Sequence, residues 1–179
     1  MSKIAFITGV TSGIGEAAAE KFLLRGWKVI GTGRRRERLD AFASKFSSDK
    51  FFPLVFDVRD VASMEELISS IPADKKNIDL LINNAGLASM NHTLLTPGNK
   101  VQEIFNTNFT GSFLLSRESA KLMKLNNYGR IINITSVGTQ MKLEGEAIYT
   151  ASKAALENLT ISMSRELSNF GITVNAIGP

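Results

Sequence analysis

The chain has 179 residues, 44% hydrophobic and 21% charged, which fits one globular domain with a substantial core. It has no cysteine, which excludes disulfides and thiolate zinc sites and fits a cytoplasmic protein, and its only histidine, His92, gives no basis for a histidine-rich metal site. The net charge of +4 is densest over 34–38 instead of being spread over several elements, so we expect no nucleic-acid surface, and no apolar run is long enough for a membrane-spanning helix.

Short apolar segments alternate with longer amphipathic ones along the whole chain. We expect strands over 3–8, 28–32, 51–56, 80–83, 130–135 and 172–177. We expect helices over 15–25, 36–46, 61–71, 97–126 and 147–170. Continuous apolar strands that alternate with helices are typical of a parallel sheet built from right-handed βαβ units. The sequence therefore predicts a single α/β domain over 1–179, a Rossmann-type doubly wound sheet of strand order 3-2-1-4-5-6 with helices on both faces.

A glycine-rich turn, Thr8-Gly9-Val10-Thr11-Ser12-Gly13-Ile14-Gly15, follows the first expected strand. Glycine permits backbone angles closed to other residues and lets a pyrophosphate approach the chain. The N-terminus of the helix that follows offers unpaired N–H groups and a partial positive charge to phosphates. We therefore expect a dinucleotide to bind here. The expected contacts are Gly9, Thr11, Ser12, Gly13, Ile14 and Gly15.

The end of the second expected strand indicates which dinucleotide is bound. NAD-selective sites usually carry an acidic residue here, which binds the adenosine ribose hydroxyls. This chain has Gly33 at that place, followed by Arg34 and Arg35. A guanidinium matches a phosphate well, and positive charge at a helix N-terminus is unfavourable unless it binds an anion. The pattern favours NADP(H) over NAD(H), with Arg34 as the first contact of the 2′-phosphate and Arg35 as the second.

Tyr149 and Lys153 lie four residues apart in the last expected helix, so both side chains share one face. A free tyrosine has a pKa of roughly 10 and exchanges protons poorly at neutral pH. A nearby cation favours the phenolate and lowers that pKa. The pair therefore has the chemistry of a proton-transfer device, although the spacing by itself also fits an ordinary helix surface.

Together these motifs resemble the short-chain dehydrogenase/reductase family, and in particular its compact single-domain branch. Within that branch the sequence most resembles the 3-oxoacyl-carrier-protein reductase-like group. The resemblance rests on the glycine turn, on Asn83-Asn84-Ala85-Gly86, and on Asn175-Ala176-Ile177-Gly178-Pro179. It also rests on four residues in the order and approximate spacing of the family's active-site tetrad. These are Asn108, Ser136, Tyr149 and Lys153.

The resemblance implies a role for each residue. Tyr149 would exchange the substrate proton, Lys153 would bind the nicotinamide ribose and lower the Tyr149 pKa, and Ser136 would bind the substrate oxygen. Asn108 would hold a water that links Lys153 to solvent. The adenosine half of the cofactor would meet the residues that follow the third and fourth strands. These are Asp57, Val58, Asn84, Ala85 and Gly86.

The implied activity is hydride transfer between NADP(H) and a small carbonyl compound or secondary alcohol. The alternative is a protein of the same fold that binds NADP(H) as a sensor or scaffold with little or no turnover. The two long helices, 97–126 and 147–170, resemble those that form homodimers and homotetramers in the family. The family pattern continues past Pro179 with a substrate loop and a further strand, so we expect this chain to be a truncated form of the domain with weak activity.

Overall fold

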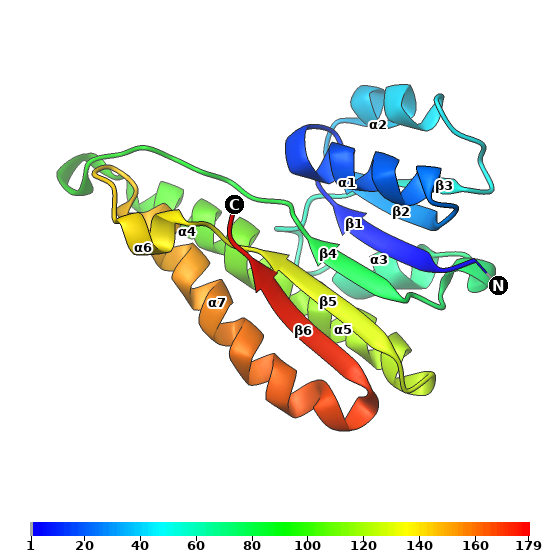
Figure 1. Ribbon diagram of the computed structural model, residues 1–179. Coiled ribbons are helices and arrows are strands. Elements are labelled where there is room, and N and C mark those ends of the chain that lie inside the picture. The colour runs from blue at the N-terminus through cyan, green and yellow to red at the C-terminus, as the bar shows by residue number, and fades with distance from the viewer. Residues whose placement is uncertain (1) are drawn as a thin grey trace.

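The computed structural model describes residues 2–179 and places six parallel strands in one sheet of order β3-β2-β1-β4-β5-β6 (Figure 1). The expected fold class and strand order are therefore confirmed. The strands are β1 (Ile4–Thr8), β2 (Lys28–Gly33), β3 (Phe51–Val55), β4 (Leu80–Asn83), β5 (Gly129–Ile134) and β6 (Ile172–Ile177).

The strands at the centre of the sheet are the most deeply buried. Every residue of β1 and β4 is buried, which is why these strands are continuous apolar runs and not alternating ones. In the register of β1 and β2, Thr8 lies beside Thr32, so the carboxyl ends of the two strands reach the same edge of the sheet. The chain order reverses between β1 and β4, and in open α/β sheets such a switch point is where ligands bind.

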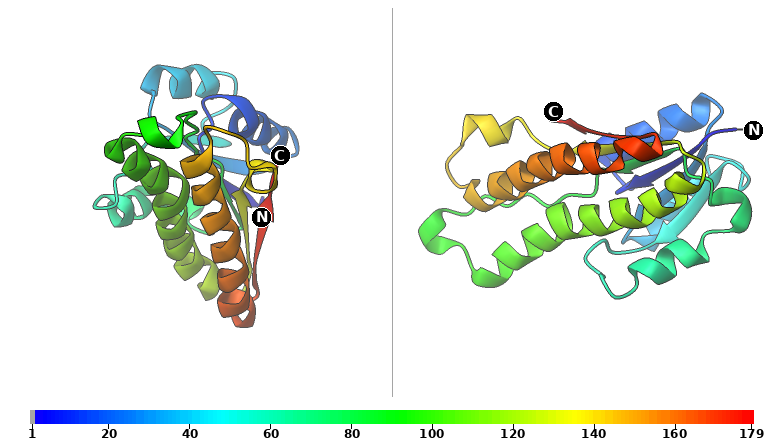
Figure 2. Two further views of the ribbon diagram at one scale, coloured as in Figure 1. Left: turned by 90° about the vertical axis from the view of Figure 1, so that its left-hand side faces the viewer. Right: turned by 90° about the horizontal axis from the view of Figure 1, so that it is seen from below.

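Helices cover both faces of the sheet (Figure 2). Helices α1 (Gly13–Leu24) and α2 (Arg36–Ala43) pack on one face, where Leu23 and Phe42 join Ile7 and Val29 in the core. The opposite face is covered by three helices whose side chains share a second core with the other side of the sheet. These helices are α3 (Met64–Ser70), α5 (Gly111–Leu125) and α7 (Ala147–Leu167).

The long helix expected over 97–126 is wrong as a single α-helix. It consists of α4 (Gly98–Phe105), a π-helical turn, η3 (Asn106–Thr110), and α5. A π turn adds one residue to the helical repeat and often occurs at functional sites. Here it contains Asn108, whose buried side chain binds the backbone of Leu87, so a contact from outside the helix accompanies the irregular turn.

Other differences from the expected elements are smaller. The expected helix over 61–71 begins only at Met64, and the one over 36–46 ends at Ala43. A short helix, α6 (Gly138–Met141), was not expected, and it ends at Lys142, which has a φ of 53°. The remaining elements are short 3-10 helices. They are η1 (Ala73–Lys75), η2 (Thr93–Leu95) and η4 (Ser168–Phe170).

None of the helices in residues 2–179 combines the length and the apolar character needed to cross a membrane.

Candidate active site

A cleft of about 390 Å³ opens at the carboxyl ends of the strands, at the switch point of the sheet. Its walls come from the glycine-rich turn, from the ends of β2 and β3, from the segment after β4, and from β5 and α7. Most of the expected site residues line it. They are Gly9, Thr11, Ser12, Ile14, Arg34, Arg35, Asp57, Val58, Asn84, Ala85, Gly86, Ser136, Tyr149 and Lys153.

Gly13, Gly15 and Asn108 are expected site residues that do not line the cleft. Gly13 has a φ of 61° and turns the chain into α1. A Cβ at Gly15 would collide with the carbonyl oxygen of Gly9 and with the side chain of Asn84. Both glycines therefore shape the turn, and direct contact of their backbone with a dinucleotide stays a prediction.

The start of α1 suits an anionic ligand. Ser12 precedes the helix, and its side chain makes no capping hydrogen bond to the first turn. The N–H groups of that turn are then left for a ligand, and the partial positive charge of the helix N-terminus favours a phosphate. Ile14, half exposed, lies beside these groups at the cleft. The residues present at the turn therefore fit the pyrophosphate of a dinucleotide.

Thr8 stabilises the floor of the cleft, and sequence reasoning missed it. Its buried Oγ1 accepts hydrogen bonds from the N–H groups of Asn84 and Ala85, both at 2.9 Å. The Asn84 side chain donates in return to the Thr8 carbonyl oxygen at 2.9 Å. The glycine turn and the segment after β4 are thus tied together. A threonine directly before the first glycine was the only signal in the sequence.

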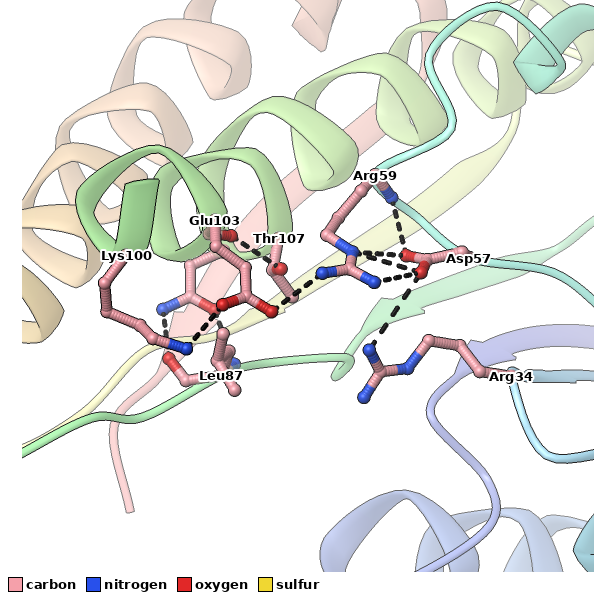
Figure 3. Close-up of polar contacts among 8 residues, drawn as sticks. Arg34, Asp57, Arg59, Leu87, Lys100, Glu103 and Thr107 are labelled. Atoms are coloured by element: carbon pink, nitrogen blue, oxygen red, sulfur yellow. Dashed lines mark hydrogen bonds and ion pairs between the residues drawn. The ribbon is translucent and has the colours of Figure 1, made fainter. Parts of the chain in front are cut away.

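The two arginines that follow β2 are held differently. Arg35 donates from Nη2 to Thr11 Oγ1 at 3.1 Å, which ties it to the glycine turn. The Arg34 side chain is 61% exposed, and its Nη1 lies 4.0 Å from Asp57 Oδ2, beyond hydrogen-bonding distance. Arg34, whose place beside Asp57 is shown in Figure 3, is therefore the more available of the two guanidiniums.

Asp57 is bound mainly by Arg59, a residue that sequence reasoning also missed. Arg59 donates from Nη2 to Asp57 Oδ2 at 2.6 Å and from its backbone N–H to Asp57 Oδ1 at 3.0 Å. Burial opposes ionisation of the Asp57 carboxyl, but the hydrogen bonds and charge of Arg59 outweigh it and hold the pKa below its usual value. Arg59 in turn donates to Glu103 Oε1 at 2.8 Å, and Lys100 binds the other oxygen of Glu103 (Figure 3).

Lys153 and Tyr149 meet in the cleft, as their spacing on one helix face indicates. The Lys153 side chain is almost fully enclosed, with 4% of the residue exposed, and its Nζ lies 6.0 Å from the centroid of the Tyr149 ring. Its ammonium donates to the carbonyl oxygen of Ile134 at 2.6 Å. Burial lowers the pKa of Lys153 to about 8, so the group still carries its charge at neutral pH.

Ser136 and Asn108 are the other two expected members of the tetrad, and they lie in different surroundings. Ser136 follows β5, lines the cleft, and accepts a hydrogen bond from the N–H of Gly138 at 3.1 Å, which orients its hydroxyl oxygen. Asn108 is fully buried behind the cleft, and its amide donates to Leu87 O at 3.0 Å and to Ser152 Oγ at 2.9 Å. Both amide hydrogens are used within the protein, and the water-holding role of Asn108 stays a prediction.

A doubly wound sheet with a glycine-rich turn at its switch point defines the class of dinucleotide-binding α/β proteins. The model of the short chain dehydrogenase family matches residues 3–179. The 3-oxoacyl-[acyl-carrier-protein] reductase FabG of Escherichia coli K12 is 37% identical over 99% of this chain and 72% of its own length. The chain therefore belongs to the short-chain dehydrogenase family of oxidoreductases.

Solved structures with the same fold hold different cofactors. Serine dehydrogenase in its closed form with NADP⁺ has a TM-score of 0.94 and 34% identity, over 98% of this chain and 71% of that one. 4-Hydroxyisoleucine dehydrogenase with NADH has a TM-score of 0.89 and 31% identity, over 99% and 75%. Across these proteins and a short-chain dehydrogenase from Streptomyces avermitilis, this chain spans between 66% and 75% of the relative's length.

Proposed function

We propose that this protein is an NADP(H)-dependent oxidoreductase acting on a small carbonyl compound or secondary alcohol, with Tyr149 as the general acid and base. One observation carries the proposal. The buried ammonium of Lys153 lies beside the Tyr149 ring in the same cleft as the glycine turn. A sensor or scaffold would have no need for a buried cation, which is costly to desolvate, next to a phenol.

The chain's own residues divide the work of holding the cofactor. The first turn of α1 would bind the pyrophosphate, Arg34 the 2′-phosphate, and Asp57 with Val58 the adenine. Asn84, Ala85 and Gly86 would line the adenosine side, which Thr8 holds in place. When bound, the nicotinamide would supply the hydride chemistry that no side chain provides.

Three residues would then act on the substrate oxygen. Ser136 would donate a hydrogen bond to it, and Tyr149 would give it a proton in the direction of reduction. The Lys153 charge would stabilise the phenolate that remains after this proton transfer. In the direction of alcohol oxidation, the same phenolate would accept the proton.

The preference for NADP(H) rests on the second strand. Among solved relatives both cofactors occur, so the argument comes from this chain's residues. Gly33 stands where an NAD-selective site would carry an acidic residue, and the exposed Arg34 guanidinium lies at the cleft wall where a 2′-phosphate would come. Replacing Arg34 with alanine should weaken NADPH binding about tenfold more than NADH binding, because a charge-assisted hydrogen bond is lost with one and not the other.

Residues 1–179 would form one NAD(P)-binding domain, and we propose that it self-associates as a homodimer or homotetramer through α5 and α7. An apolar groove runs between these helices, with Phe113 37% exposed at its rim. Met163, Leu167 and Phe170 also line the groove. Sedimentation of the protein and of a Phe113→Asp variant would show whether this face is the contact.

The central test is Tyr149→Phe. NADPH oxidation should be followed with 3-oxoacyl thioesters, sugars, ketosteroids and quinones as candidate substrates. Loss of the phenol should lower turnover by about 10²–10⁴-fold, the typical contribution of general acid–base catalysis, while NADPH binding changes little. Unchanged turnover in this variant would refute the role of Tyr149. No oxidation of NADPH with any carbonyl compound would favour the sensor.

A further inference from the structure

Five charged side chains of alternating sign form a chain of ion pairs that begins at the cleft and leads away from it (Figure 3). From the cleft outward they run Arg34, Asp57, Arg59, Glu103 and Lys100. The nitrogen–oxygen distances between successive side chains are 2.5–2.8 Å, except for the first, between Arg34 and Asp57, which is 4.0 Å. With three cations and two anions, the chain leaves one positive charge unmatched. The long first link puts that charge on Arg34, at the cleft.

Arg59 occupies the Asp57 carboxylate and so leaves Arg34 without a close ion-pair partner. Its side chain holds both carboxylate oxygens of Asp57, with Nε 3.0 Å from each and Nη2 2.6 Å from Oδ2. A paired, bidentate geometry of this kind is the strongest form of a guanidinium–carboxylate contact. Because Arg59 also binds Glu103 on α4, it is held from two sides and cannot easily turn away from Asp57.

Without Arg59, the nearest guanidinium to the Asp57 carboxylate would be Arg34. Its Nη1 needs to move by about 1 Å to reach hydrogen-bonding distance. An exposed side chain makes such a movement at little cost. Arg34 would then be engaged by Asp57, and a phosphate would have to compete with an adjacent carboxylate whose charge was no longer neutralised.

We infer that Arg59 is a positioning residue that sets the cofactor preference: by binding Asp57 it keeps Arg34 available to the 2′-phosphate. This inference rests on the proposed function, in which Arg34 reads the 2′-phosphate. Arg59 does not line the cleft and acts through Asp57. Its anchor, Glu103, lies 44 residues further along the chain, on α4, and does not line the cleft either.

The test measures binding of the adenosine half alone, with adenosine 2′,5′-bisphosphate and adenosine 5′-monophosphate as probes in calorimetric titrations. The quantity compared is the ratio of the two dissociation constants, which cancels effects common to both. In Arg59→Gln the preference for the bisphosphate, measured by this ratio, should fall about tenfold. That factor corresponds to the loss of one charge-assisted hydrogen bond. In Arg59→Gln combined with Asp57→Asn the advantage should return to that of Asp57→Asn alone, because no carboxylate remains to bind Arg34.

Two further variants serve as a control and as a second test. Arg117→Gln, the matched control, removes an arginine that binds Glu118 at 2.7 Å on α5, away from the cleft, and should leave the ratio unchanged. Glu103→Gln keeps Arg59 but removes its anchor, and should shift the ratio in the same direction by less. This variant tests the inference even where Arg59→Gln fails to fold.

If Arg59→Gln lowers the affinity for both probes equally, the inference is overturned and Arg59 has only a structural role. A shift that persists in the Asp57→Asn background would also overturn it, because the effect would then not pass through Asp57. The Arg34→Gln variant separates these outcomes from failure of the proposed function. If Arg34→Gln weakens both probes equally, Arg34 does not read the phosphate. If it selectively weakens the bisphosphate and Arg59→Gln does not, only the present inference fails.

Discussion

The side chain of Asn108 holds the backbone of Leu87 from both sides. Its Oδ1 accepts from the Leu87 N–H at 2.8 Å, and its Nδ2 donates to the Leu87 carbonyl oxygen at 3.0 Å. The third hydrogen bond, to Ser152 Oγ, connects the same amide to α7, one residue before Lys153. A single buried amide in the π turn therefore fixes the segment after β4 against the helix that carries Tyr149 and Lys153.

Replacing Asn108 with leucine should destabilise the protein. The change removes the two hydrogen bonds to the half-buried backbone of Leu87 and the one to the buried Ser152 Oγ, and a typical hydrogen bond of this kind contributes about 0.5–1.5 kcal/mol. Urea unfolding of the cofactor-free protein measures the loss. Asn106→Ala is the matched control, because Asn106 lies in the same π turn but bonds only the exposed side chain of Gln102. Equal losses in the two variants would contradict the role given to Asn108.

Thr8 and Thr32 give a second matched pair, since they lie side by side on β1 and β2 and both are buried. The Thr8 hydroxyl accepts two backbone N–H bonds, whereas Thr32 Oγ1 has no hydrogen-bond partner among residues 2–179. Thr8→Val should therefore lower the free energy of unfolding by about 1–3 kcal/mol, and Thr32→Val should be neutral or stabilising. Unfolding curves without cofactor decide the matter, and a larger loss in Thr32→Val would show that the hydrogen bonds of Thr8 contribute little.

Gly15→Ala should damage the glycine turn. The new Cβ would meet the backbone oxygen of Gly9, which is held in a turn with a φ of 73° and has little room to move. Overpacking of this kind typically costs about 1–3 kcal/mol, and we expect a matching loss of adenosine-phosphate binding. Gly98→Ala is the control, since a Cβ there meets nothing within 4 Å. Normal stability and binding in Gly15→Ala would show that the turn can yield.

The buried lysine predicts a pH dependence of stability. Lys153 has a pKa of about 8 in the folded protein against 10.5 for an ordinary lysine. Between these two values the unfolded chain keeps a proton that the folded state has released, so stability must rise with pH across this window. Below pH 8 the folded protein bears the full cost of burying the charge, about 3 kcal/mol for a shift of this size.

Lys153→Met removes this titration and tests it. The variant should gain stability relative to the parent at pH 7, apart from the loss of the bond to Ile134 O, and that difference should shrink as the pH rises from 8 toward 10.5. Denaturant midpoints of both proteins at several pH values provide the measurement. A difference that stays constant with pH would mean that Lys153 is not desolvated as its burial indicates.

Much of the fold was predictable because its signals are local. Apolar runs, the glycines of the first turn and the four-residue spacing of Tyr149 and Lys153 each depend on neighbours within a few positions. The break in the long helix at Asn108 was not predictable from periodicity. The accompanying contact, with Leu87, lies 21 residues away and belongs to another element.

By itself the sequence determined the α/β class, the strand order, the position of the glycine turn and the helix face that Tyr149 and Lys153 share. The tertiary structure alone decided which polar groups hold the site together: Thr8 with Asn84, Asn108 with Leu87, and Arg59 with Asp57 and Glu103. The reason is physical. Helical and strand periods and glycine backbone angles are properties of short segments. The hydrogen bond between Thr8 and Asn84 joins residues 76 positions apart, and only the folded chain fixes where their polar atoms lie.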